Sequence, residues 1–246
     1  MRRYQWIIIL VLSLLGLSGG LYAIHYIIFH DSHHIFIYLL GDVAFVPIEV
    51  LLVTLIIHRL LSQREKRAIL EKLNLVIGAF FSQVGTKALT YFSDFDPKLD
   101  TIRRYLLVNT NWDDQDFNNI SQKLVNFNFR IDIKQIDLVL LRNLLINERD
   151  FLLRLLENPA LLEHESFTKL LRAIFHLTEE LGYREDLLNL PDSDYQHLTG
   201  DIERAYRLLV HEWLDYMKYL EKNYPFLFSL AMRTNPFDLS SSPVVK

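Results

Sequence analysis

The N-terminal part of the chain contains two long apolar segments separated by a short polar turn. Residues Trp6 to Phe29 include no charged side chain, and residues Ile35 to Ile57 include only two acidic ones. Each segment reaches the roughly 20 residues that a helix needs to cross about 30 Å of hydrocarbon. The polar residues 30–34 between them are sufficient to reverse the chain. The pattern therefore predicts a two-helix transmembrane hairpin over residues 1–58, with spans at about 6–29 and 35–57.

Basic residues predict the orientation of this hairpin. Two arginines precede the first span, and the connecting turn has neither lysine nor arginine. The basic residues that follow the second span are Arg59, Arg64, Lys66, Arg67 and Lys72. Because cytoplasmic flanks carry the excess of lysine and arginine, we expect a multi-pass protein of the cell (inner) membrane with both termini cytoplasmic. The alternative is a cleavable signal peptide ending near Gly20, but the apolar run is longer than a usual signal core.

The rest of the chain alternates amphipathic runs with short breakers, which is typical of helices. We expect a juxtamembrane helix over residues 59–92, a cytoplasmic α-helical domain over residues 93–234 and a flexible tail over residues 235–246. Within the domain, the predicted helices cover residues 98–108, 113–127, 134–156, 166–182 and 197–224, with a short one after Pro225. The predicted fold class is all-α.

Small residues form a stripe along the first predicted span. Their spacings of three and four place them on one helical face and include a Gly-x-x-x-Gly pair. Residues of similar size lie at matching depths in the second span. This transmembrane packing set consists of Ser13, Gly16, Gly20, Ala23, Gly41 and Ala44. Such a stripe allows close helix approach, either within the hairpin or between two copies of the chain.

The second span carries two intramembrane acids. Asp42 and Glu49 are seven residues apart, which places them on nearly the same helical face, about 10 Å apart along the axis. Pro47 between them cannot donate a backbone hydrogen bond, so it leaves a carbonyl free and favours a kink. These three residues are candidates for an ion or proton pathway, which would require an oligomer. The alternative is a structural role for neutral, hydrogen-bonded acids.

Two polar stripes recur at four-residue spacing in the predicted domain. They comprise Arg172, His176 and Glu180 on one helix, and Arg207, His211 and Asp215 on a later one. If the helices were neighbours, their imidazoles and carboxylates could form a metal or acid–base site. Solvent-facing pairs explain the same spacing more simply, so we predict no metal site there. The histidine-rich turn at residues 30–34 likewise needs no metal.

Composition excludes several classes of function. The formal net charge is -4 and no long basic patch is present, which argues against a nucleic-acid partner. The chain has no cysteine, so disulfides and thiolate chemistry are impossible. Neither a Gly-rich phosphate loop nor a hydrolase motif is found, and we predict no cofactor and no catalytic residue.

A family resemblance can be stated from short segments of the chain. The segments are Gly41 to Phe45 with Pro47, His58 to Leu61, Leu156 to Pro159 and His176 to Glu180. They resemble a family of uncharacterised prokaryotic membrane proteins with two transmembrane helices. The resemblance implies the two-span topology and brings no activity, cofactor or site residue.

Three classes of function follow from these patterns. The first is a membrane-anchored helical scaffold or regulator that binds the lipid bilayer, forms homo-oligomers and contacts a cytoplasmic protein partner. The alternative is an oligomeric ion or proton conductor that uses the intramembrane acids. An enzyme is the third class, and no motif supports it.

Overall fold

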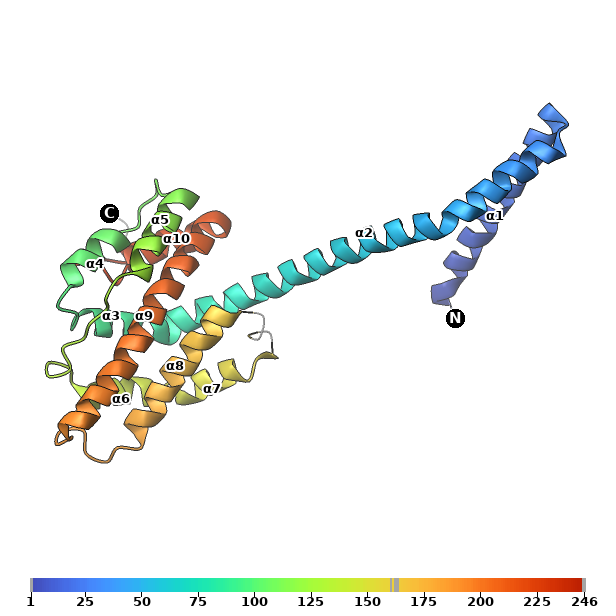
Figure 1. The fold of residues 1–246 in the computed structure, drawn as a ribbon. Coiled ribbons are helices and arrows are strands. Elements are labelled where there is room, and N and C mark those ends of the chain that lie inside the picture. Colours follow the sequence, from blue (N-terminus) through green and yellow to red (C-terminus); the bar gives the residue numbers. More distant parts are fainter. Residues whose placement is uncertain (1, 160, 162–163, 245–246) are drawn as a thin grey trace. The chain divides into compact units, whose positions relative to one another are not determined.

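The chain is all-α in the computed structural model, which describes residues 2–159, 161 and 164–244 (Figure 1). For residues 2–6 and 66–70 the structure describes only the backbone. The side chains of four basic residues used to predict the orientation therefore lie outside the described part: Arg2, Arg3, Lys66 and Arg67. Every regular element in these ranges is a helix, which confirms the predicted fold class. The chain divides into two compact units, Met1–Glu65 and Lys66–Lys246.

The first unit contains helix α1 (Arg2–Phe29) and the first part of helix α2 (Ser32–Phe80). The apolar stretches Ile7–Phe29 and Ser32–Glu65 span 23 and 34 residues and are long and apolar enough to cross a membrane. No part of either stretch is buried inside the protein. Helix α2 continues through Pro47 without a break.

The turn between α1 and α2 is shorter than the sequence predicts. His30 has a φ of 50°, the left-handed conformation that commonly ends a helix, and its N–H donates to the carbonyl of Tyr26 at 2.8 Å. Asp31 then accepts a hydrogen bond from the N–H of His34 at 3.1 Å, which caps the start of α2. The rings of His25 and His34 stack across the turn with centroids 5.8 Å apart. Two residues therefore suffice to reverse the chain.

A π-helical turn, η1 (Phe81–Gly85), connects α2 to helix α3 (Thr86–Ser93). The helical segment thus ends at Ser93, and the π-turn is not visible in the sequence pattern. A Cβ atom at Gly85 would lie 2.7 Å from ring atoms of both Phe80 and Phe81. Glycine is required there because the two rings pack directly over the backbone.

The remaining helices build the second unit. They are α4 (Leu99–Leu106), α5 (Asp114–Val125), α6 (Leu138–Ile146), α7 (Arg149–Leu156), α8 (Glu165–Gly182), α9 (Asp192–Asn223) and α10 (Pro225–Arg233). The run predicted as one helix over residues 134–156 is two helices, α6 and α7. Helix α9 begins five residues before the predicted position, since Pro191 is extended and the acids Asp192 and Asp194 favour a helix N-terminus.

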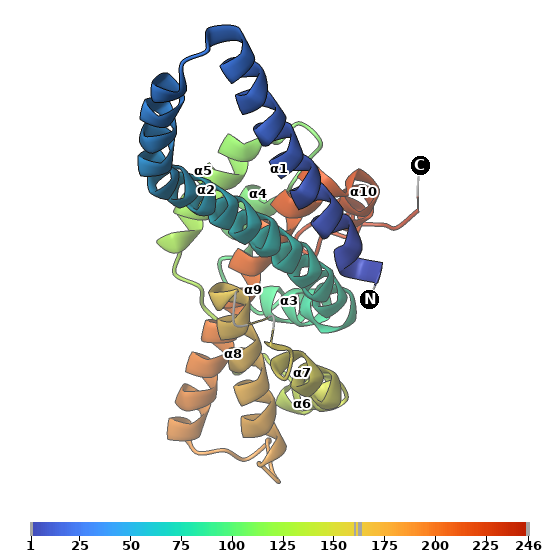
Figure 2. The same cartoon turned by 90° about the vertical axis from the view of Figure 1, so that its right-hand side faces the viewer.

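Helices α8 and α9 pack side by side at the centre of the second unit (Figure 2). Helices α6 and α7 contact α8, whereas α3, α5 and α10 contact α9. The fully buried core includes Phe167 and Leu177 of α8 and Tyr206 of α9. This pairing decides which polar side chains of the two central helices can meet.

The segment predicted to be flexible from residue 235 is fastened at its start. Asn235 donates from its side-chain amide to the carbonyl of Leu106 at 2.8 Å, and both groups are buried. Phe237 is 1% exposed, and its ring centroid lies 5.4 Å from that of Trp213. A buried amide and an aromatic ring therefore hold the chain beyond α10 as far as Phe237.

Candidate functional site

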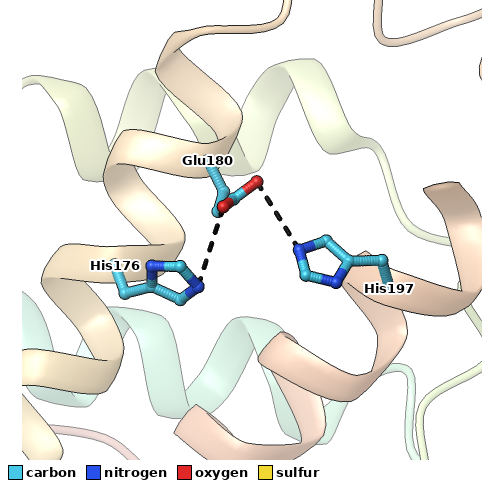
Figure 3. Close-up of side chains that lie close together, drawn as sticks. All are labelled: His176, Glu180 and His197. Atoms are coloured by element: carbon cyan, nitrogen blue, oxygen red, sulfur yellow. Dashed lines mark ion pairs between the residues drawn. The ribbon is translucent and has the colours of Figure 1, made fainter.

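Four titratable side chains converge between α8 and α9. His176 and Glu180 project from α8, and His197 and Asp201 project from α9. Each histidine lies four residues before its acid, so each pair occupies one face of its helix. Figure 3 shows Glu180 between the two imidazole rings. We call these four residues the α8–α9 cluster.

The polar atoms of the cluster are closely and evenly spaced. The Nε2 atom of His176 lies 3.7 Å from Oε1 of Glu180, and Nε2 of His197 lies 3.6 Å from Oε2 of the same carboxylate. Both Nε2 atoms lie 3.4 Å from Oδ2 of Asp201. One ligand atom from each of His176, Glu180 and His197 falls within 4.8 Å of the others. The two imidazoles therefore face the same two carboxylates.

Asp201 is the most buried member of the cluster, with a side chain only 2% exposed. Its Oδ1 atom accepts a hydrogen bond from Nη2 of Arg204. Among the described atoms, its Oδ2 atom has no hydrogen-bond partner. Burying a carboxylate oxygen without a hydrogen-bond partner costs free energy. The unpaired oxygen of Asp201 also makes the space between the two imidazoles a favourable place for positive charge.

Arg184 holds the carboxylate of Glu180 in position. Its Nη1 atom lies 2.7 Å from Oε2 of Glu180, and its Nε and Nη2 atoms donate to Asp194 at 2.7 Å each. The hydrogen bond from Arg184 is the main reason that the pKa of Glu180 is lowered. The same arginine lowers the pKa of Asp194. Glu180 is thus ionised near neutrality and oriented toward the histidines.

The structure brings together only part of the polar set named from the sequence. His176 and Glu180 are in the cluster, whereas Arg172, Arg207 and Asp215 are exposed. His211 is half-buried, with its ring centroid 6.3 Å from that of Phe129.

The second imidazole of the cluster is His197, which the sequence reasoning missed. The signal was present, because His197 and Asp201 repeat the same four-residue spacing. The predicted helix starts at His197 and so places this residue at a helix end, whereas it lies in the second turn of α9.

The residues named for the membrane segments lie in the first unit. The side chains of Asp42 and Glu49 are exposed along α2. A Cβ added at Gly16, Gly20 or Gly41 would meet no atom within 4 Å. The other members of the packing set, Ser13, Ala23 and Ala44, are exposed as well. The structure therefore does not bring the small-residue stripe against the second helix.

A second polar group lies at the start of α8. Glu212 of α9 is 3% exposed, and its Oε1 atom lies 3.6 Å from Nδ1 of His164. Burial raises the pKa of Glu212 to about 7 despite a hydrogen bond to Ser166. Burial also lowers the pKa of His164, which caps α8 by accepting from the N–H of Phe167. Because His164 acts as a cap, this group is a structural feature of the α8–α9 contact.

The second unit also carries an apolar groove of about 430 Å³ between the end of α2, α9 and α10. Its walls include Leu75, Gly78, Tyr216, Tyr224, Leu227 and Leu230. Three of these, Leu75, Leu227 and Leu230, are exposed aliphatic side chains. Exposed apolar surface gathered around a concavity is typical of a binding surface.

Comparison with known proteins places the chain in a family. Residues 2–61 match the family described as "MJ1433, N-terminal helical domain", and residues 69–233 match "Uncharacterized protein MJ1433, C-terminal helical domain". A protein of Methanocaldococcus jannaschii, named "Uncharacterized protein MJ1433", is 49% identical over 241 residues, which cover 98% of this chain and 97% of the relative. The chain belongs to the MJ1433 family.

Membership of the MJ1433 family agrees with the resemblance to an uncharacterised family and extends over nearly the whole chain. The two family boundaries, at residues 61 and 69, fall on either side of the division between the two compact units. No solved structure matches the chain. The family domains are described as helical and the relative as uncharacterised, so the site must be interpreted from its own geometry.

Proposed function

We propose that this protein is a membrane-anchored helical interaction protein with two transmembrane helices and both termini in the cytoplasm. The observation that carries the proposal is the pair of apolar stretches in α1 and α2, which are long enough to cross a bilayer and have no protein surface covering them. Aliphatic side chains along their whole length are exposed. A bilayer supplies the apolar surroundings that such surfaces need.

The apolar groove supports a binding role for the second unit. Leu227 and Leu230 of α10 and Leu75 of α2 present aliphatic surface at its rim. Three tyrosines, Tyr216, Tyr219 and Tyr224, also line it, and aromatic side chains are enriched in binding surfaces. The occupant that we propose is the same groove region of a second copy, because a tether to one membrane keeps copies together in the same orientation.

Single-cysteine labelling tests the topology. The chain has no cysteine, so each introduced thiol is the sole target of a membrane-impermeant maleimide. We expect Ser32→Cys at the start of α2 to react from the outer side of intact cells, and Ser241→Cys to react only after the membrane is opened. Labelling of Ser241→Cys in intact cells, or extraction of the chain by carbonate, would contradict the proposed anchoring.

The role of the groove is tested by mass measurement of the full chain in detergent. We expect light scattering to report an oligomer for the parent and a monomer for the double variant Leu227→Asp, Leu230→Asp. Leu188→Asp is the matched control, because Leu188 is an exposed leucine of the same unit outside the groove. An unchanged oligomer in the double variant would exclude the groove as the contact between copies.

A further inference from the structure

We propose that the α8–α9 cluster binds one divalent transition-metal ion, with Zn²⁺ the ion that fits best. The ligand atoms are Nε2 of His176, Nε2 of His197 and a carboxylate oxygen of Glu180, which lie within 4.8 Å of one another. We add Oδ2 of Asp201 as the fourth ligand, because it lies 3.4 Å from both nitrogens. This inference concerns a metal site in the second unit and does not depend on the membrane proposal. It is also a site that the sequence patterns alone led us not to expect.

The spacing of the donor atoms carries the argument. Zinc binds histidine nitrogen at about 2.0–2.1 Å and carboxylate oxygen at about 2.0–2.2 Å, usually with four ligands in a tetrahedron. Donors at the corners of such a tetrahedron lie about 3.3–3.5 Å from one another. The four nitrogen–oxygen distances in the cluster are 3.4, 3.4, 3.6 and 3.7 Å. The two distances to Oδ2 of Asp201 match such edges, whereas the two to Glu180, which involve its two different oxygens, exceed them by a few tenths of an ångström.

The same distances do not suit direct hydrogen bonds. A charge-assisted bond between imidazole nitrogen and a carboxylate has a length of about 2.7–2.9 Å. All four contacts are longer than this by at least 0.5 Å. The imidazoles and carboxylates thus lie close together without forming direct hydrogen bonds of that length.

Asp201 supplies an independent observation. Its side chain is 2% exposed, and its Oδ2 atom points toward both imidazoles without a hydrogen-bond partner. A buried charge is tolerated when it is paired or coordinates a metal. A cation between the two histidines would satisfy this oxygen directly.

The type of donors indicates which ion would bind. Two imidazole nitrogens with two carboxylate oxygens suit zinc and its neighbours in the first transition series better than the hard ions Mg²⁺ and Ca²⁺, which prefer oxygen donors. The side chains of His176 and His197 are 45% and 50% exposed, so an ion can reach them from solvent. Four protein donors would complete the tetrahedron and leave no position for a substrate. The ion would therefore have a structural role and cross-link α8 and α9.

The surrounding arginines hold the carboxylates in position. Arg204 binds Oδ1 of Asp201 and leaves Oδ2 facing the histidines. Arg184 binds Oε2 of Glu180 and leaves Oε1 on the side of His176. Such outer hydrogen bonds orient ligating carboxylates in metal sites.

Metal titration of the full chain in detergent, purified without an oligohistidine tag, tests the proposal. We expect Zn²⁺ to bind by calorimetry at neutral pH, and Co²⁺ to give the intense visible absorption of tetrahedral coordination. His176→Gln and His197→Gln should each remove one equivalent of bound metal and this absorption. Asp201→Asn should weaken the binding at least tenfold.

His33 and His34 provide the matched control, because these neighbouring histidines lie in the first unit, outside the cluster. The double variant His33→Ala, His34→Ala should keep the equivalent assigned to the cluster and its absorption. Zinc should also raise the Tm of the parent and of this control, and the rise should be lost in the cluster variants. Equal isotherms for the parent and both cluster variants, or no binding to the parent, would overturn the proposal and leave the cluster as an ion-pair network.

Discussion

Arg184 and Asp194 form a bidentate ion pair that joins the loop after α8 to the first turn of α9. Nε and Nη2 of the arginine each donate to a different carboxylate oxygen at 2.7 Å. The third donor, Nη1, binds Glu180 two residues before the end of α8. This fork fixes the register of the two central helices and thereby sets the distance between the imidazoles of the α8–α9 cluster.

Replacing this arginine by lysine should destabilise the protein although the charge is kept. Lysine cannot bind two carboxylates through a planar fork. We expect Arg184→Lys to lower the free energy of unfolding by about 1–2 kcal/mol, since the guanidinium is largely buried and its hydrogen bonds are charge-assisted. Arg172→Lys, at an exposed position of α8, should change it by less than about 0.5 kcal/mol. Urea unfolding of the full chain in detergent measures both, and equal effects would argue against a role for the fork.

Gly85 should not tolerate a larger side chain. A Cβ atom there would stand 2.7 Å from ring atoms of Phe80 and Phe81, and neither ring can move freely because both are buried. We expect Gly85→Ala to cost about 1–3 kcal/mol of stability through overpacking. Gly200→Ala is the control, because a Cβ at that helical glycine meets no atom within 4 Å and alanine has the higher helix propensity. A Tm that falls for Gly85→Ala and stays or rises for Gly200→Ala is the expected result.

Glu212 should make the free energy of unfolding decrease as the pH rises. A carboxyl group whose pKa is lowered on folding has the opposite effect. Its pKa is raised to about 7 in the folded protein from a usual value near 4.5, so between these values the folded state binds more protons than the unfolded state. Stability should therefore decrease as the pH rises through this window, by at most about 3 kcal/mol. Glu212→Gln should remove this loss, so the variant should gain on the parent between pH 5 and pH 8.

The measurement for Glu212 is the difference in unfolding free energy between variant and parent at several pH values. Glu157→Gln provides the control, because it removes a carboxyl group from an exposed position. A constant difference for Glu212→Gln would show that the carboxyl group is ionised in the same way in both states.

The intramembrane acids allow a direct test of the alternative function, ion or proton conduction. Asp42 and Glu49 lie on exposed positions of α2, as groups lining an oligomeric pathway would. If the chain conducts, reconstituted liposomes should show proton or cation flux that is lost in Asp42→Asn and Glu49→Gln. Ser13→Ala, in the other apolar helix, should leave the flux unchanged. Absence of flux in the parent would end this alternative.

The sequence predicts helix content and positions well, because long amphipathic and apolar periodicities are local properties of the chain. It could not predict the α8–α9 cluster for two reasons. The early start of α9 depends on Pro191 and the acids that follow it, and a predicted start five residues later places His197 at the helix end and not on a helical face with Asp201. The choice between His197 and His211 as the partner of His176 depends on the packing register of two helices, which periodicity does not encode.

The segment after α10 gives a final test of where the folded unit ends. Phe237 is 1% exposed and packs against Trp213, whereas Leu239, two residues later, is 82% exposed. We expect Phe237→Ala to lower the free energy of unfolding by about 3–5 kcal/mol, the usual cost of deleting a buried aromatic ring, and to shift the fluorescence of Trp213. Leu239→Ala should have no measurable effect on either quantity. If both substitutions were neutral, the buried position of Phe237 would not exist in solution, and the folded unit would end at α10 as the sequence pattern predicts.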